Sequence, residues 1–126
     1  MQGVGGVVQT RSMHAAHVVE LAQQLPELVL KDYSDWTSIT FRGRGFAWVN
    51  HAANTAMIKS THLEREAMLG SDPETFSAGW ASQSTAWVSV ALERADPEEV
   101  FEILADAWRM TATKKAIAAF DQAMGF

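Results

Sequence analysis

Apolar residues spaced three and four positions apart predict helices towards both ends of the chain. From Ser12 to Leu25 such residues recur at helical spacing, with Ser12 available as the N-cap, and Pro26 follows where a helix ends. Asp96-Pro97-Glu98-Glu99 combines an N-cap, a proline at the first helical position and an acidic third position. This pattern predicts a helix from Pro97 to about Met110.

Two further helices are indicated by their first residues. Thr61-His62-Leu63-Glu64 has the form of a capping box, and we expect its helix to end at Gly70 in the left-handed conformation. Thr113 either opens a separate helix that runs to Met124 or lies inside a single helix that continues from Met110. Gly125 is the expected stop in both cases.

Alternation of apolar and polar residues is strongest from Thr37 to Asn50 and predicts a β-hairpin. Ile39 and Phe41 alternate with polar positions before Arg-Gly-Arg-Gly at 42–45, and Phe46 and Trp48 alternate with smaller residues after it. The two glycines favour a tight turn at 42–45. This assignment places Phe46 and Trp48 on one face of the second strand.

Three other segments are expected to extend the sheet. We expect a short edge strand at residues 28–30 and a third strand from Thr55 to Lys59. A further strand is expected from Thr85 to Leu92, with Val88, Val90 and Leu92 on one face and Trp87, Ser89 and Ala91 on the other. Residues 72–80 are assigned to a loop. The order of elements predicts an α+β fold, an antiparallel β-sheet with helices packed on one face.

Composition bounds this domain and its location. A chain of 126 residues holds one core, so we assign 12–126 to a single domain and 1–11 to a flexible N-terminal segment. No cysteine is present, which excludes disulfides, thiolate zinc sites and cysteine nucleophiles and fits a reducing compartment. No segment has the pattern of a signal peptide or a membrane span. We therefore expect a cytoplasmic protein with no membrane partner.

Several short segments together resemble one protein family in order and spacing. They are Ser38 to Trp48, Met57-Ile58-Lys59, Ser71 to Phe76, Gly79-Trp80, Trp87-Val88, Asp96 to Glu99 and Thr113-Lys114-Lys115. From about Val18 to Phe120 the chain is similar to the MmcQ/YjbR-like proteins. The resemblance implies a frataxin (CyaY)-like α+β fold with one sheet face open. It also implies DNA binding of the "double wing" kind, an inference from fold alone.

The chain departs from the family pattern in the second strand of the hairpin. Members usually carry a lysine where this sequence has Phe46, and a phenylalanine where it has Trp48. The change removes a positive charge from the sheet, so the open face is expected to be more aromatic and less basic than in relatives.

Basic residues at three places are candidates for binding nucleic acid or another anion. Arg42 and Arg44 at the hairpin tip suit phosphates, and Thr113 with Lys114 and Lys115 suits an anion if a helix begins there; Lys59 is the remaining candidate. The alternatives are a solvated hairpin and a continuous helix. A net charge of −5 opposes attraction to nucleic acid over the whole surface.

Five tryptophans in one domain indicate that some aromatic rings line the uncovered sheet face. The candidates are Phe46, Trp48, Trp80 and Trp87, whereas Phe41 and Trp108 are expected in the core. Such a face suits stacking of nucleic-acid bases, a small aromatic ligand or a protein partner, including a second copy of the chain.

Catalytic, cofactor and metal motifs are not found in the sequence. His14, His17 and Glu20 lie on one side of a helix but are better explained as a solvated face. His51 and His62 are the remaining acid–base candidates. We predict a binding module without enzymatic activity, cofactor or metal, either monomer or homodimer. It binds DNA through the basic residues or another partner through the aromatic face, and salt dependence separates the two.

Overall fold

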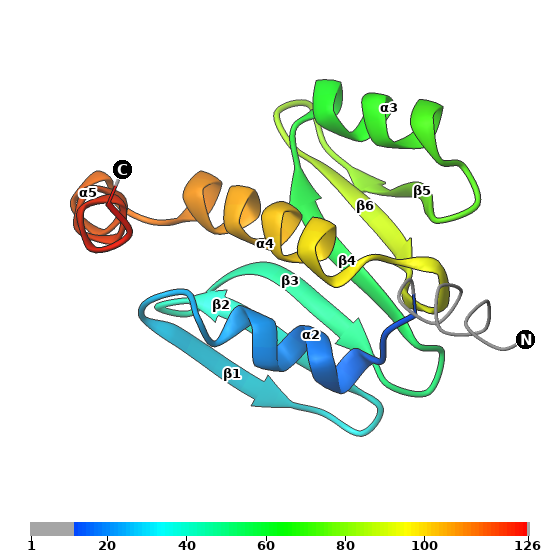
Figure 1. Cartoon of the computed structure of the whole chain (residues 1–126), viewed down its shortest axis with the longest axis horizontal. Helices are drawn as coiled ribbons and strands as arrows, with labels where there is room; N and C mark the ends of the chain where they lie inside the picture. The colour runs from blue at the N-terminus through cyan, green and yellow to red at the C-terminus, as the bar shows by residue number, and fades with distance from the viewer. Residues whose placement is uncertain (1–11, 126) are drawn as a thin grey trace, which may run out of the picture.

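An open six-stranded antiparallel sheet with helices on one side forms the protein (Figure 1). The structure is a computed structural model that describes residues 12–125, so the predicted flexible segment at 1–11 lies outside the described residues. The strands are β1 (Leu28–Asp32), β2 (Trp36–Phe41), β3 (Arg44–Asn50), β4 (Thr55–Ser60), β5 (Phe76–Ala81) and β6 (Ala86–Ala91), in the spatial order β1-β2-β3-β4-β6-β5. The helices are α2 (Ala15–Ala22), α3 (His62–Ser71), α4 (Pro97–Thr111) and α5 (Lys114–Ala123), with a 3₁₀ turn at Leu92–Arg94. The predicted α+β class is confirmed.

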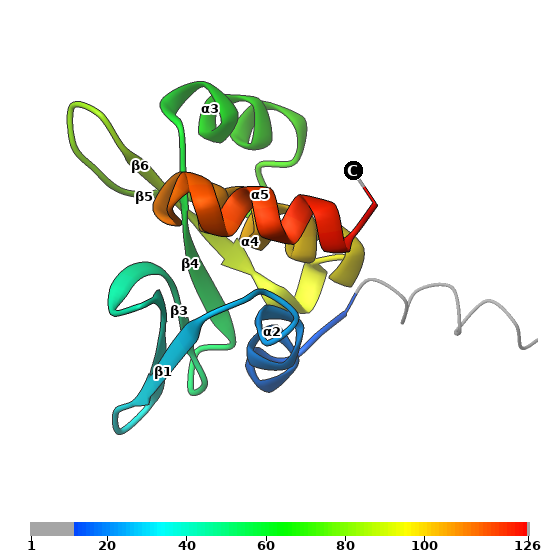
Figure 2. The same ribbon diagram turned by 90° about the vertical axis from the view of Figure 1, so that its left-hand side faces the viewer.

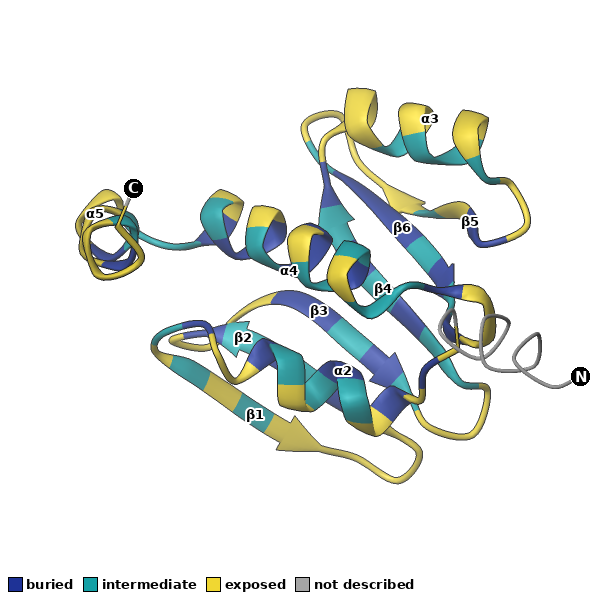
Figure 3. Cartoon of the chain, in the orientation of Figure 1, coloured by how far each residue is buried: buried dark blue, intermediate teal, exposed yellow. Residues whose placement is uncertain are grey.

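The helices cover one face of the sheet and leave the other uncovered. Figure 2 shows the strands on one side and α2, α4 and α5 on the other, while α3 packs against β5 and β6. The core between the layers is apolar, and its largest fully buried side chains include Trp108, Phe41, Phe46 and Phe76. Figure 3 shows buried segments in β3, β4 and β6, whereas β1 at the sheet edge is mostly exposed.

Helical and alternating patterns predicted most elements. In α4 the residues Val100, Ile103, Leu104, Ala107, Trp108 and Thr111 recur at helical spacing and are buried, and Thr61 and Glu64 form the predicted capping box at the start of α3. On β6, the face with Val88 and Val90 points into the core as expected. Elements whose side chains show a clear period are thus correctly assigned.

Three local predictions are wrong, and a fourth is confirmed in position only. Residues 76–81, assigned to a loop, form edge strand β5. Gly70 is not left-handed, because α3 continues through it to Ser71. The first helix begins at Ala15 with His14 at the N-cap position, so Ser12 does not cap it. Asp96 occupies the N-cap position of α4 as expected, but its side chain makes no capping hydrogen bond.

A β-bulge in the β2–β3 hairpin changes the direction of one candidate residue. Ile39 pairs with Ala47 while Thr40 pairs with Gly45, so Phe46 is the extra residue on β3. The bulge turns Phe46 into the core beside Ala47, and its side chain is fully buried. Assigning Phe46 to the open face was therefore wrong, because strict alternation does not hold across the bulge.

The question of one or two helices near the C-terminus is decided by Thr113. The helix α4 ends at Thr111, and the Thr113 hydroxyl accepts a hydrogen bond from the Ala116 amide at 3.1 Å as the N-cap of α5. The chain turns between the helices, and Phe120 of α5 packs against Trp108 of α4 with ring centroids 5.1 Å apart. The segment therefore forms two helices, and the alternative of one continuous helix from Met110 is wrong.

Candidate functional site

A two-residue turn forms the tip of the β2–β3 hairpin. Arg42 and Gly43 both have positive φ, 51° and 94°, as this type of turn requires. Gly43 thus serves the turn as predicted, but the second left-handed residue is Arg42 and not Gly45. Phe41 pairs with Arg44, which places the Arg44 side chain on the helix side of the sheet.

The two hairpin arginines differ in their partners. The Arg42 guanidinium lies 2.6 Å from the Glu27 carboxylate and 5.0 Å from the centre of the Phe41 ring. Its backbone amide also donates to the Glu27 carbonyl oxygen. Arg44 is exposed and has no ion pair among the described residues. The sequence assigned both arginines to an anion, but only Arg44 has its charge free.

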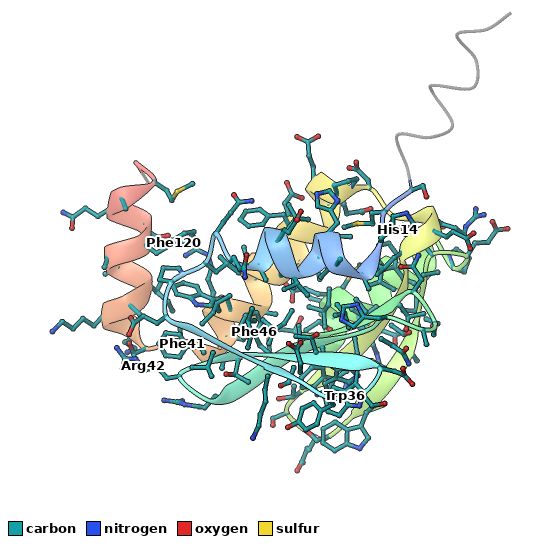
Figure 4. The ribbon with its side chains drawn as sticks, turned by 90° about the horizontal axis from the view of Figure 1, so that it is seen from below. His14, Trp36, Phe41, Arg42, Phe46 and Phe120 are labelled. Carbon is teal, nitrogen blue, oxygen red and sulfur yellow. The ribbon has the colours of Figure 1, made fainter. Side chains whose placement is uncertain are left out.

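Lysines at the start of α5 lie at the same end of the molecule as the hairpin tip. Figures 1 and 2 show this helix and the tip at one end, and Figure 4 places Arg42 beside the start of α5. Lys114 and Lys115 are exposed and have no ion pair within residues 12–125. The Thr113 hydroxyl already caps the helix, so the lysines are the groups there that can attract an anion.

Lys59 reaches the same end from the sheet. The β3–β4 pairing stops at Ala47 and Ile58, so no β3 residue lies opposite Lys59. Its amine donates to the Thr111 hydroxyl at 3.3 Å and lines a groove between α3 and α4. Lys59 is therefore half-buried and already hydrogen-bonded, which makes it a weaker anion ligand than the sequence indicated.

An ion pair fastens α5 to α4 at this end. Arg109 and Asp121 lie 2.6 Å apart, and the Arg109 guanidinium is 5.5 Å from the centre of the Phe120 ring. The hydrogen bond from Arg109 lowers the pKa of Asp121 below its ordinary value and raises that of Arg109. The charge of Arg109 is thus balanced, and the unpaired cations at this end are Arg44, Lys114 and Lys115.

A row of four aromatic rings crosses the uncovered sheet face. Tyr33 stacks on Trp36 with centroids 4.1 Å apart and planes 17° from parallel; Trp36 lies 6.4 Å from Trp48, and Trp48 lies 5.0 Å from Trp87. Figure 4 shows Trp36 projecting away from the helices. We call these four residues the aromatic row.

Exposure varies along the aromatic row. Tyr33 is 45% and Trp36 38% exposed, Trp48 is half-buried, and Trp87 is 8% exposed because neighbouring side chains cover it. Trp80 is 65% exposed on β5 but has no ring contact within residues 12–125, so the structure does not bring it into the row. The predicted aromatic face thus exists, with Trp48 and Trp87 in it, Trp80 beside it and Phe46 absent.

The uncovered face carries little charge. Cross-strand pairing places on it a central line of residues from Lys31 through Ser38, Trp48 and Met57 to Ser89. The charged residues at strand positions on this face are Lys31 and Lys59, but the Lys59 amine reaches the Thr111 hydroxyl of α4 on the helix side, so Lys31 is the charge that these strands leave on the face. No strand residue on this face is acidic.

Carboxylates gather in the groove between α3 and α4, on the other side of the sheet. Glu64, Glu99, Glu102 and Asp106 line this groove of about 240 Å³ with Lys59. Burial and then the nearby Glu64 charge raise the pKa of Asp106, although Arg109 acts in the opposite direction. Among the described residues no group of three or more metal-binding side chains is placed to hold an ion.

The histidines considered for acid–base chemistry make structural hydrogen bonds. The Nε2 atom of His62 is bonded to the Ser82 carbonyl oxygen at 2.7 Å. His51 Nε2 lies 2.9 Å from the Thr37 hydroxyl, which itself donates to Asp32 at 2.7 Å, so the histidine is the donor to Thr37. The His51 ring therefore connects a loop to β2, and the His62 ring connects the start of α3 to the β5–β6 loop.

Tyr33, Trp36 and Lys31 are members of the uncovered surface that were not among the predicted site residues. Side chains alternate between the two faces along β2, so Trp36 lies on the same face as Ser38 and Thr40. Ile39 and Phe41 lie on the other face, so the sequence already indicated the direction of Trp36. Tyr33 lies in the turn after β1, where no periodicity predicts its direction.

Comparisons with known proteins agree with this architecture. A model of the YjbR family matches residues 23–110. The crystal structure of Deinococcus radiodurans protein DR2400, which has a DUF419 domain, superposes on this chain with a TM-score of 0.69. The superposition covers 94% of this chain and 92% of the DR2400 chain, and the two sequences are 16% identical. No curated protein sequence matches the chain. Within residues 12–125, no helix has both the length and the apolar character that crossing a bilayer requires.

Proposed function

The chain belongs to the YjbR family, and we propose that it is a binding module that holds nucleic acid by its phosphates at the hairpin end. One observation carries the proposal. Unpaired cations from separate parts of the chain, Arg44 on β3 and Lys114 and Lys115 on α5, gather at one end of the fold. Scattered solubilising charges have no reason to converge in this way.

The neighbouring carboxylates at this end are occupied. Glu27 is paired with Arg42 and Asp121 with Arg109, so both are neutralised where a phosphate approaches. Four of the 15 acidic residues behind the net charge of −5 lie instead in the groove between α3 and α4, on the helix side. A local basic surface on an acidic protein is sufficient for phosphate binding, because salt screens charges beyond about 8–10 Å.

The proposed role is binding without catalysis, in the cytoplasm. Phosphate contacts position nucleic acid but carry no sequence information, so this end predicts weak dependence on base sequence. Wild-type protein should therefore bind a fluorescein-labelled DNA duplex at low salt, with affinity that falls steeply as salt rises. Each phosphate neutralised contributes about −0.9 to the slope of log K against log salt concentration.

The test compares matched arginine variants by fluorescence anisotropy. Arg44→Ala should weaken binding and make the salt slope shallower by about 0.9. The triple variant of Arg44, Lys114 and Lys115 to alanine should make it shallower by about 2.7. Arg94→Ala is the control. Arg94 is an exposed arginine on the 3₁₀ turn, outside the hairpin end, and it forms an ion pair with Glu74. Equal loss in Arg94→Ala and Arg44→Ala, or no binding of wild type at low salt, would refute the proposal.

A further inference from the structure

The aromatic row has no role in phosphate binding, yet it runs across the uncovered face from Tyr33 to Trp87. Its two most exposed rings, Tyr33 and Trp36, form a stacked pair at the end of β2 remote from the hairpin tip. Exposed aromatic rings are costly in water unless a partner covers them. Resting on the proposed function, we propose that the ligand is single-stranded nucleic acid, whose bases stack on the aromatic row.

Base stacking requires flat rings that the ligand can reach from one side. Trp36, at 38% exposure, projects away from the helices, and Trp48 continues the row 6.4 Å away. A duplex hides the faces of its bases inside the stack, whereas a single strand presents them. Proteins that bind single strands place aromatic side chains on such a surface, next to a basic groove for the backbone.

The charge of the face distinguishes nucleic acid from a cationic ligand. No strand position on it is acidic, although the chain as a whole has a net charge of −5. Lys31 is exposed on the same line of residues as Trp48 and has no ion pair among the described residues. A phosphate that follows the stacked bases thus meets a lysine and no carboxylate from the strands.

Polar groups between the rings suit the edges of bases. Ser38, Asn50 and Thr55 are half-exposed on the same face, and their hydroxyl and amide groups both donate and accept hydrogen bonds. Single-strand recognition commonly combines stacking with such contacts to base edges.

The hairpin connects the row to the basic end. Trp48 lies four residues after Arg44 on β3, about 13 Å away at about 3.3 Å per residue. Thr40 and Gly45 are the face residues between the row and the tip, and neither is charged. A strand stacked on the row can therefore pass around the hairpin tip and reach Arg44 and the α5 lysines.

The experiment measures the affinity of the protein for a labelled oligo-dT strand and for a duplex of equal length. A length of about 12 nucleotides is within the usual site size of such surfaces. Wild-type protein should bind the single strand more tightly, with quenching of tryptophan fluorescence. Trp36→Ala should weaken single-strand binding by about 5- to 100-fold and leave duplex binding unchanged. Trp36→Tyr keeps a stacking ring and should retain most of the affinity.

Trp80→Ala is the matched control, because it removes a more exposed tryptophan that lies outside the row. The inference fails if Trp80→Ala weakens single-strand binding as much as Trp36→Ala, or if the duplex binds at least as tightly as the strand. It also fails if sedimentation shows a dimer that Trp36→Ala dissociates, since a second copy then covers the face. Duplex binding that depends on Arg44 alone, with no effect of Trp36→Ala, leaves the proposed function intact and removes only this inference.

Discussion

Trp108 links the two parts of the proposed phosphate site, and replacing it with phenylalanine tests that link. Its ring is fully buried, lies edge-on to Phe41 with centroids 5.9 Å apart, and contacts Phe120 of α5. Its indole N–H donates to the Pro26 carbonyl oxygen at 3.0 Å, across 82 positions of sequence. One side chain thus joins the hairpin, the start of β1 and α5.

The expected loss in Trp108→Phe has two parts. Phenylalanine has no N–H, so the Pro26 carbonyl loses its partner, at a cost of about 1–3 kcal/mol. The smaller ring gives up apolar burial equivalent to about one or two methylenes, or about 1 kcal/mol. Together they remove about 2–4 kcal/mol from a stability typically of about 5–15 kcal/mol. At about 4 °C per kcal/mol for a domain of this size, the melting temperature should fall by about 8–16 °C.

Urea and thermal unfolding followed by far-ultraviolet circular dichroism measure this loss without depending on tryptophan emission. Trp80→Phe is the control, since Trp80 is 65% exposed and should change stability by less than about 0.5 kcal/mol. A loss below about 1 kcal/mol in Trp108→Phe would show that the indole hydrogen bond contributes little, because the lost burial alone accounts for about that much. Equal losses in both variants would contradict the assignment of Trp108 to the core.

Three further substitutions test other parts of the fold. Gly79→Ala places a methyl group 2.8 Å from the Trp87 carbonyl oxygen and against the Met57 sulfur, so it should destabilise the sheet by about 1–3 kcal/mol in urea unfolding. Thr61→Ala removes half of the capping box and should cost about 1 kcal/mol; full stability in Thr61→Ala would mean that the cap is dispensable. The raised pKa of Asp106 means that the folded protein binds its proton more tightly than the unfolded chain, so Asp106 lowers stability as pH rises above 3.8. Asp106→Asn should thus raise the melting temperature at neutral pH but not in acid, and an equal rise at both would exclude this cause.

The periodic spacing of apolar residues was sufficient to predict the helices and strands that bury one face against the core. The stripe of α4 and the alternation of β6 are both imposed by burial, so they are visible in the sequence. Strand β5 lacks that signal because it lies at the sheet edge, where Ser77 and Ala78 are both exposed and the register shifts before Ala81. Its Gly79-Trp80 pair is typical of a loop, yet the glycine is needed there because Met57 occupies the space of a side chain.

The candidate site was predictable by residue type but not by direction. A bulge of one residue turned Phe46 into the core, and nothing local in the sequence announces a bulge. Likewise, the partner that neutralises Arg42 is Glu27, fifteen positions earlier, and the pairing exists only because β1 lies beside β2. Contacts between elements depend on register and topology, which a single sequence does not fix.

The net charge of −5 was the main argument against nucleic acid, and the fold weakens it. Charge acts over about one Debye length, so its placement matters more than its sum. The α3–α4 groove concentrates carboxylates on the helix side, where burial and then the charge of Glu64 raise the pKa of Asp106, while no strand residue on the uncovered face is acidic. The hairpin end adds Arg44, Lys114 and Lys115, which are exposed and have no ion pair among the described residues. In the proposed complex, the acidic helix layer repels the nucleic-acid strand, so the strand approaches the aromatic row from the uncovered side.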